Sequence, residues 1–151
     1  MCINSIIVQN GYDIILSSEI TLNNKKILFT QKRTLIKELG KPDKIKNLVS
    51  DFTDEKFQRL YYGKDYFEIS SKGIVVSFSL NTDKFGVTSN QFKVGTQEIN
   101  LKKIFPNSTE KVIENQGIRL IRVQVYNEED TFLLFRVKDK RIMSIEIWYN
   151  E

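Results

Sequence analysis

The sequence predicts an α+β domain with an antiparallel sheet and two short helices packed on one of its faces. Apolar and polar residues alternate with period two along most of the chain. Short segments with helical spacing, near residues 33–40 and 100–105, interrupt this alternation twice. The 151 residues include 40% hydrophobic and 28% charged residues, which is ordinary for a globular protein. We therefore expect a single domain, 1–151, that folds without a disulfide or metal.

The first residues predict two hairpins. Residues 6–8 and 13–16 are short apolar runs on either side of Asn10-Gly11, a dipeptide that favours a tight turn. Residues 19–22 and 26–29 flank Asn23-Asn24 in the same way.

The period then changes to that of a helix of about two turns. Leu35, Ile36 and Leu39 give it an apolar side, and Thr34 is placed to cap its first turn. Gly40 and Pro42 end it. Such a short helix must dock on the sheet to be stable. A polar connector is expected over residues 47–56.

Three strands follow at residues 59–62, 66–70 and 74–80, and residues 81–90 form a loop. In the third strand, Ile74, Val76, Phe78 and Leu80 are expected on one face, and Val75, Ser77 and Ser79 on the other.

The second half of the chain repeats this order. Asn100 is expected to cap a second short helix that ends at Pro106, and Asn100 lies 66 positions after Thr34. Strands follow at residues 118–126, 131–137 and 141–149. We predict two internal repeats, residues 18–90 and 91–151.

The composition argues against most catalytic chemistries. The chain has no histidine, one cysteine (Cys2), and no phosphate-binding loop among its 7 glycines. We therefore expect no enzyme, no catalytic residue, no metal ligand and no cofactor. The alternative is a hydrolase or metal-binding protein that uses Asp51, Asp54 and Glu55.

Charge and hydropathy limit the partners and the location. The net charge of +4 is spread along the chain, whereas nucleic-acid binders concentrate theirs, so we expect no nucleic-acid partner. No apolar run is long enough for a membrane span. A single cysteine favours the cytoplasm. The alternative is a periplasmic lipoprotein in which Cys2 remains after removal of a signal.

The outward-facing strand residues carry the functional prediction. In the strand at 141–149, Met143, Ile145, Ile147 and Tyr149 should face the core, and Ser144, Glu146 and Trp148 the outside. The same alternation predicts an outward surface rich in Trp, Tyr and Arg, the residue types that dominate protein-binding hot spots. The predicted partner-binding residues are Tyr61, Tyr66, Arg122, Tyr126, Phe132, Arg136, Glu146 and Trp148. The alternative is that loops or the N-terminal hairpins cover this surface.

Residues 34–43, TLIKELGKPD, resemble the short-helix LG-x-P signature of β-lactamase-inhibitor-protein-like domains, which the SmpA/OmlA-type outer-membrane assembly lipoprotein shares. Together with the hairpin at residues 20–27, they also resemble an uncharacterised family of small bacterial proteins. The resemblance implies tandem helix–strand units that bind proteins through the sheet, and no catalytic residues. In the second unit Phe105-Pro106 replaces the signature.

These observations lead us to expect a non-catalytic protein-binding module. Within that class we expect a bacterial inhibitor or toxin-immunity protein that covers the active site of a cognate toxin or enzyme. Tyr126, Phe132 and Trp148 would be the anchors, and Arg122 and Arg136 would pair with acidic groups of the partner. An envelope-associated structural or assembly module is the alternative. The basic charge balance argues against a nuclease as the target, because nuclease inhibitors present acidic surfaces.

Overall fold

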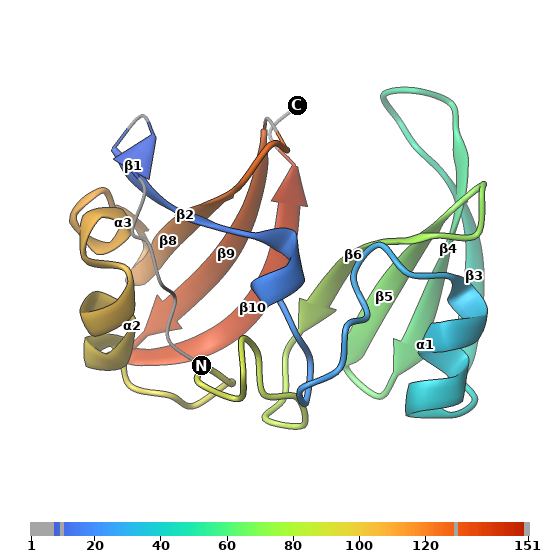
Figure 1. Ribbon diagram of the computed structural model, residues 1–151, viewed down its shortest axis with the longest axis horizontal. Helices are drawn as coiled ribbons and strands as arrows, with labels where there is room; N and C mark the ends of the chain where they lie inside the picture. The colour runs from blue at the N-terminus through green and yellow to red at the C-terminus, as the bar shows by residue number, and fades with distance from the viewer. Residues whose placement is uncertain (1–7, 10, 129, 150–151) are drawn as a thin grey trace.

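The computed structural model describes residues 8–9, 11–128 and 130–149, and it shows an α+β fold with one large, mostly antiparallel sheet (Figure 1). The predicted fold class is confirmed. Across the sheet the strands follow the order β1 (Val8–Gln9), β2 (Tyr12–Ile15), β8 (Ile118–Val125), β9 (Thr131–Lys138), β10 (Arg141–Tyr149), β6 (Val75–Leu80), β5 (Asp65–Ser70), β4 (Lys56–Tyr62) and β3 (Lys44–Val49), and β7 (Ile113–Asn115) pairs with β8 beside this path. Cys2 and part of the first predicted strand lie outside the described residues.

Two groups of strands meet in the middle of the sheet (Figure 1). Strands β3 to β6 form one half beside helix α1 (Lys32–Leu39), and strands β8 to β10 form the other half beside α2 (Glu98–Ile104) and α3 (Pro106–Glu110). They join where β6 pairs with β10. The second half also receives β2, which pairs with β8 in parallel. The repeats proposed for residues 18–90 and 91–151 stay a prediction.

The core lies between the helices and one face of the sheet, which we call the core face. On this face Leu60, Phe67 and Phe78 follow one another across β4, β5 and β6, and all are almost fully buried. Leu35 of α1 and Leu101 of α2 have no exposed surface and belong to the same hydrophobic cluster. A buried side chain of this kind contributes about 1.5–3 kcal/mol, so the core stabilises the whole sheet.

Helices α1 and α2 both begin two residues earlier than their predicted caps. The residues at the N-terminal caps are Gln31 and Gln97, and neither makes a side-chain capping hydrogen bond. Thr34 and Asn100 therefore lie inside the helices, and the predicted capping roles were wrong. Gly40 follows α1 with a φ of 84°, which is consistent with its predicted role in ending the helix.

Pro106 does not simply end the second helix. Phe105 leaves the helical conformation, and Pro106 then starts α3 at its first position, where the missing N–H of proline costs nothing. The buried carboxylate of Asp13, on β2, accepts hydrogen bonds from the backbone N–H groups of Asn107 and Ser108, each at 3.0 Å. A strand 94 residues away in sequence thus caps this helix.

Two predictions about connecting segments were wrong. Residues 19–22 and 26–29 are not paired strands: a short 3₁₀-helix, η1 (Ser17–Glu19), precedes a turn in which Leu22 bridges to Lys25. Both residues of the Asn23-Asn24 turn have positive φ, as a tight turn requires. The predicted connector at 47–56 is shorter than expected, because β3 continues to Val49.

Bulges change two face assignments. A register shift between Glu68 and Ile69 places Val75 opposite Ile69, so Val75 is buried in the core. A second shift between Ile142 and Ser144 places Ile142 in the core and leaves Met143 39% exposed. An extra residue in one strand reverses the alternation beyond it.

Candidate functional site

The candidate site is the sheet face opposite the core, which we call the outward face. The registers of neighbouring strands place its residues in rows. One row contains Arg122, Leu134, Glu146, Ser79, Tyr66, Tyr61 and Lys44. Beside it lie Gln124, Phe132 and Trp148 on one half, and Ser77, Glu68, Arg59 and Lys46 on the other. Strands β6 and β10 contribute the small residues Ser77, Ser79 and Ser144, so larger side chains flank a centre of serines.

A first cluster lies on β4 and β5. Arg59 donates hydrogen bonds to Glu68 Oε2 from Nε at 3.2 Å and from Nη2 at 2.8 Å. The guanidinium also lies 4.4 Å from the centre of the Tyr66 ring, and Tyr61 packs beside Tyr66 at 5.6 Å. Burial alone would lower the pKa of Arg59, but hydrogen bonds to Tyr61 and Glu68 and the charge of Glu68 outweigh it and raise the pKa. The positive charge of Arg59 is therefore neutralised by Glu68 of the same chain.

A second cluster lies on β2, β8, β9 and β10. The Arg122 guanidinium is 5.1 Å from the ring centre of Tyr12 and 5.8 Å from that of Phe132. Phe132 contacts Tyr12 edge-on at 5.4 Å and Trp148 at 5.9 Å. Within the described chain, Nε of Arg122 is buried and has no hydrogen-bond partner. This cluster therefore combines three aromatic rings with a cation that lacks a counter-ion among the described residues.

Arg136 and Glu146 form a pair between the two clusters. Arg136 Nη2 donates to Glu146 Oε1 at 2.8 Å, and both side chains are partly buried. A charge that is already paired within the chain contributes less binding free energy to a complex than an unpaired charge does. We had expected Arg136 to meet acidic groups of a partner; its charge is already matched by Glu146.

The structure brings most of the predicted residues to one face. Arg122, Phe132 and Trp148 lie together in the second cluster, and Tyr61 and Tyr66 lie in the first. Tyr126 is apart: it follows the end of β8, is 45% exposed, and takes part in none of the ring contacts among the described residues.

Sequence reasoning missed Tyr12. Strand β2 pairs with β8 so that Ile14 lies opposite Gln124, and Tyr12, two residues earlier, therefore lies beside Arg122. No local pattern indicates this contact, because β2 precedes β8 by about a hundred residues. Lys111 was also missed; its Nζ lies 4.4 Å from the centre of the Tyr12 ring.

The carboxylates of the alternative hydrolase or metal site lie elsewhere. Asp51, Asp54 and Glu55 are all exposed in the turn between β3 and β4. Over residues 8–9, 11–128 and 130–149, no group of three or more acidic, histidine or cysteine side chains could hold a metal ion. In the same residues, no helix has the length and apolar character needed to cross a membrane.

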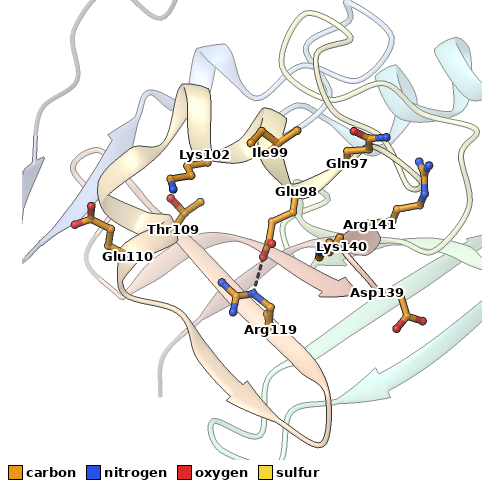
Figure 2. Close-up of a pocket in the computed structure, with 10 residues that line it drawn as sticks. All are labelled: Gln97, Glu98, Ile99, Lys102, Thr109, Glu110, Arg119, Asp139, Lys140 and Arg141. Carbon is orange, nitrogen blue, oxygen red and sulfur yellow. Dashed lines mark hydrogen bonds and ion pairs between the residues drawn. The ribbon is translucent and has the colours of Figure 1, made fainter.

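A cavity of about 620 Å³, lined mostly by polar and charged residue types, lies next to α2 and the β9–β10 turn (Figure 2). Its lining residues are Gln97, Glu98, Ile99, Lys102, Thr109, Glu110, Arg119, Asp139, Lys140 and Arg141. Arg119 Nε donates to Glu98 Oε1 at 2.6 Å, and Figure 2 shows this bond across the cavity. Arg141 Nη1 donates to the carbonyl oxygen of Gly95. Glu98 and Arg119 thus neutralise each other, and we take the outward face as the better candidate.

Comparison with known proteins gives a likeness of fold. No family model and no curated protein matches the chain. Among solved structures, it is similar to a DUF4309 family protein, YjgB, from Bacillus subtilis, with a TM-score of 0.50 and 12% sequence identity over 88% of each chain. At this identity the likeness concerns the fold alone.

Proposed function

We propose that this chain is a protein-binding module whose partner docks on the outward face. Within that class, we propose a bacterial inhibitor or immunity protein that acts in the cytoplasm by covering the active site of its partner. The observation that carries the proposal is the second cluster, where Arg122 lies against Tyr12 and Phe132 beside Trp148. Tyrosine, tryptophan and arginine are the residues in which binding energy concentrates at protein interfaces.

The position of these side chains supports docking. Helices α1, α2 and α3 pack on the core side, where Asp13 binds α3 and Leu35 and Leu101 enter the core. On the opposite face, Tyr61, Tyr66, Arg122 and Trp148 stay only partly buried. Partly buried aromatics need little further ordering when they bind, which lowers the entropic cost of association.

The experiment compares two variants in pull-downs from a lysate of the source organism. The face variant combines Trp148→Ala with Tyr61→Ala, one substitution in each cluster. The control is Phe52→Ala, which removes an aromatic ring that is 77% exposed in the β3–β4 turn. The product of the neighbouring open reading frame is tested as bait in parallel, because an immunity gene sits beside its toxin.

The face variant should lose a partner that Phe52→Ala retains, and its affinity for the purified partner should fall by at least about 30-fold for each hot spot removed. Circular dichroism and thermal unfolding check that both variants are folded. A folded face variant that binds every partner of the parent with unchanged affinity would refute the proposal.

A further inference from the structure

Two arginines occupy corresponding places in the two halves of the sheet. Arg59 on β4 lies opposite Glu68 of β5, and Arg122 on β8 lies opposite Leu134 of β9. In both halves, the residue two positions before that opposite residue is aromatic: Tyr66 in the first and Phe132 in the second. Each guanidinium lies near this ring, at 4.4 Å and 5.8 Å from its centre. The two sites therefore share a geometry.

They differ in one side chain. Glu68 accepts two hydrogen bonds from Arg59. At the corresponding position Leu134 offers no acceptor and is 2% exposed. Arg122 forms no ion pair among the described residues, and its buried Nε has no acceptor there. A partly buried cation without an acceptor is costly for the free protein.

The neighbouring charges do not supply the missing acceptor. The nearest carboxylate along the row is that of Glu146, on the far side of Leu134, and it binds Arg136. On the other side, Lys111 Nζ lies 4.4 Å from the centre of the Tyr12 ring. The Arg122 guanidinium thus has the rings of Tyr12 and Phe132 as neighbours, and its positive charge, unpaired among the described residues, favours an anion.

We propose that a carboxylate of the partner protein accepts hydrogen bonds from Arg122, as the carboxylate of Glu68 does from Arg59. This inference rests on the proposed function and names the chemistry of the partner: an aspartate or glutamate side chain that reaches the guanidinium beside Tyr12, Phe132 and Trp148. Charge-assisted hydrogen bonds of this kind are about twice as strong as neutral ones. The bound carboxylate thereby offsets the desolvation penalty of the partly buried Arg122 in the free protein.

The experiment titrates the ¹⁵N-labelled protein with benzoate and follows the Nε–Hε signals of its arginines by NMR. Benzoate carries a carboxylate and one aromatic ring, and a ligand of its size should bind with a dissociation constant on the order of 10 mM. The Arg122 signal should shift. The Arg59 signal should not, because the Arg59 guanidinium already donates its hydrogen bonds to Glu68. Neutral benzamide should move neither signal. Equal shifts of both arginines, no shift of Arg122, or a larger response to phenyl phosphate than to benzoate would overturn the inference.

Two substitutions exchange the properties of the two sites. Leu134→Glu places a carboxylate opposite Arg122 and should abolish its response to benzoate, whereas Leu134→Gln, of similar size without the charge, should retain it. Glu68→Gln should make Arg59 responsive to benzoate, and this result does not depend on whether Leu134→Glu folds. If Glu68→Gln leaves Arg59 silent, or a folded Leu134→Glu responds like the parent, the equivalence of the sites is wrong. Because benzoate needs no protein partner, this inference can fail while the pull-down succeeds, and the reverse.

Discussion

Asp13 should be one of the most important polar residues for stability, and Asp13→Ala tests this. Its side chain is 1% exposed and accepts hydrogen bonds from the backbone N–H groups of Asn107 and Ser108 and, at 2.8 Å, from Asn107 Nδ2. Removing a helix cap costs about 1 kcal/mol. The N–H of fully buried Ser108 then lacks an acceptor, which costs roughly 2 kcal/mol more.

The total of about 3 kcal/mol corresponds to a fall in melting temperature of roughly 6–12 °C for a chain of this size. Urea and thermal unfolding followed by circular dichroism measure both quantities. Asp51→Ala is the control, because Asp51 is exposed in a turn, and a surface substitution should change stability by less than about 0.5 kcal/mol. If Asp13→Ala loses no more stability than Asp51→Ala, the cap contributes nothing and our reading of α3 is wrong.

Two further predictions concern ionisation and metals. Burial, and then the charges of Glu128 and Glu68, raise the pKa of Tyr149 to about 12 from 10.0. The folded protein therefore keeps this proton where the unfolded chain loses it, so stability should fall as the pH rises from about 10 to about 12. Tyr149→Phe should remove the corresponding step from an ultraviolet titration and flatten that fall; an unchanged titration would contradict the assignment. Calcium, magnesium or manganese should leave the melting temperature unchanged, because Asp51, Asp54 and Glu55 are exposed. A metal-dependent rise that Asp51→Asn with Asp54→Asn abolishes would instead favour the hydrolase or metal alternative.

The sequence predicted the outward face well where alternation was unbroken. In β8, period two separates the partly buried Arg122 from the fully buried Ile121 and Val123, whereas in β9 both Phe132 and Leu133 are buried. It failed where a bulge inserts a residue, as at Met143, because a bulge leaves no mark in the apolar pattern. Strand β3 was not predicted at all, because an edge strand is mostly exposed and needs little apolar alternation.

The candidate site was harder to predict than the face that carries it. Trp148 and Arg122 were identified by residue type and face. Phe132, which lies near both, is placed between them by the order of β8, β9 and β10, and Tyr12 reaches Arg122 only through the parallel pairing of β2 with β8. Such long-range pairings follow from the packing of the whole chain, so a local pattern cannot reveal them. The pairing of Arg136 with Glu146 likewise depends on register.

We expect the join between β6 and β10 to be the line along which the sheet bends, because its ladder is short. Across it only Ile145 and Glu146 are paired in the ladder, whereas β9 and β10 are paired from Arg141 to Tyr149. Side chains supplement the short ladder: Ser77 Oγ donates to the carbonyl of Ile147, and the Tyr149 hydroxyl donates to that of Val76. Bending along this line would change the span between the Arg59 and Arg122 clusters while leaving each intact, so the curvature of a docked surface could set the angle between the halves.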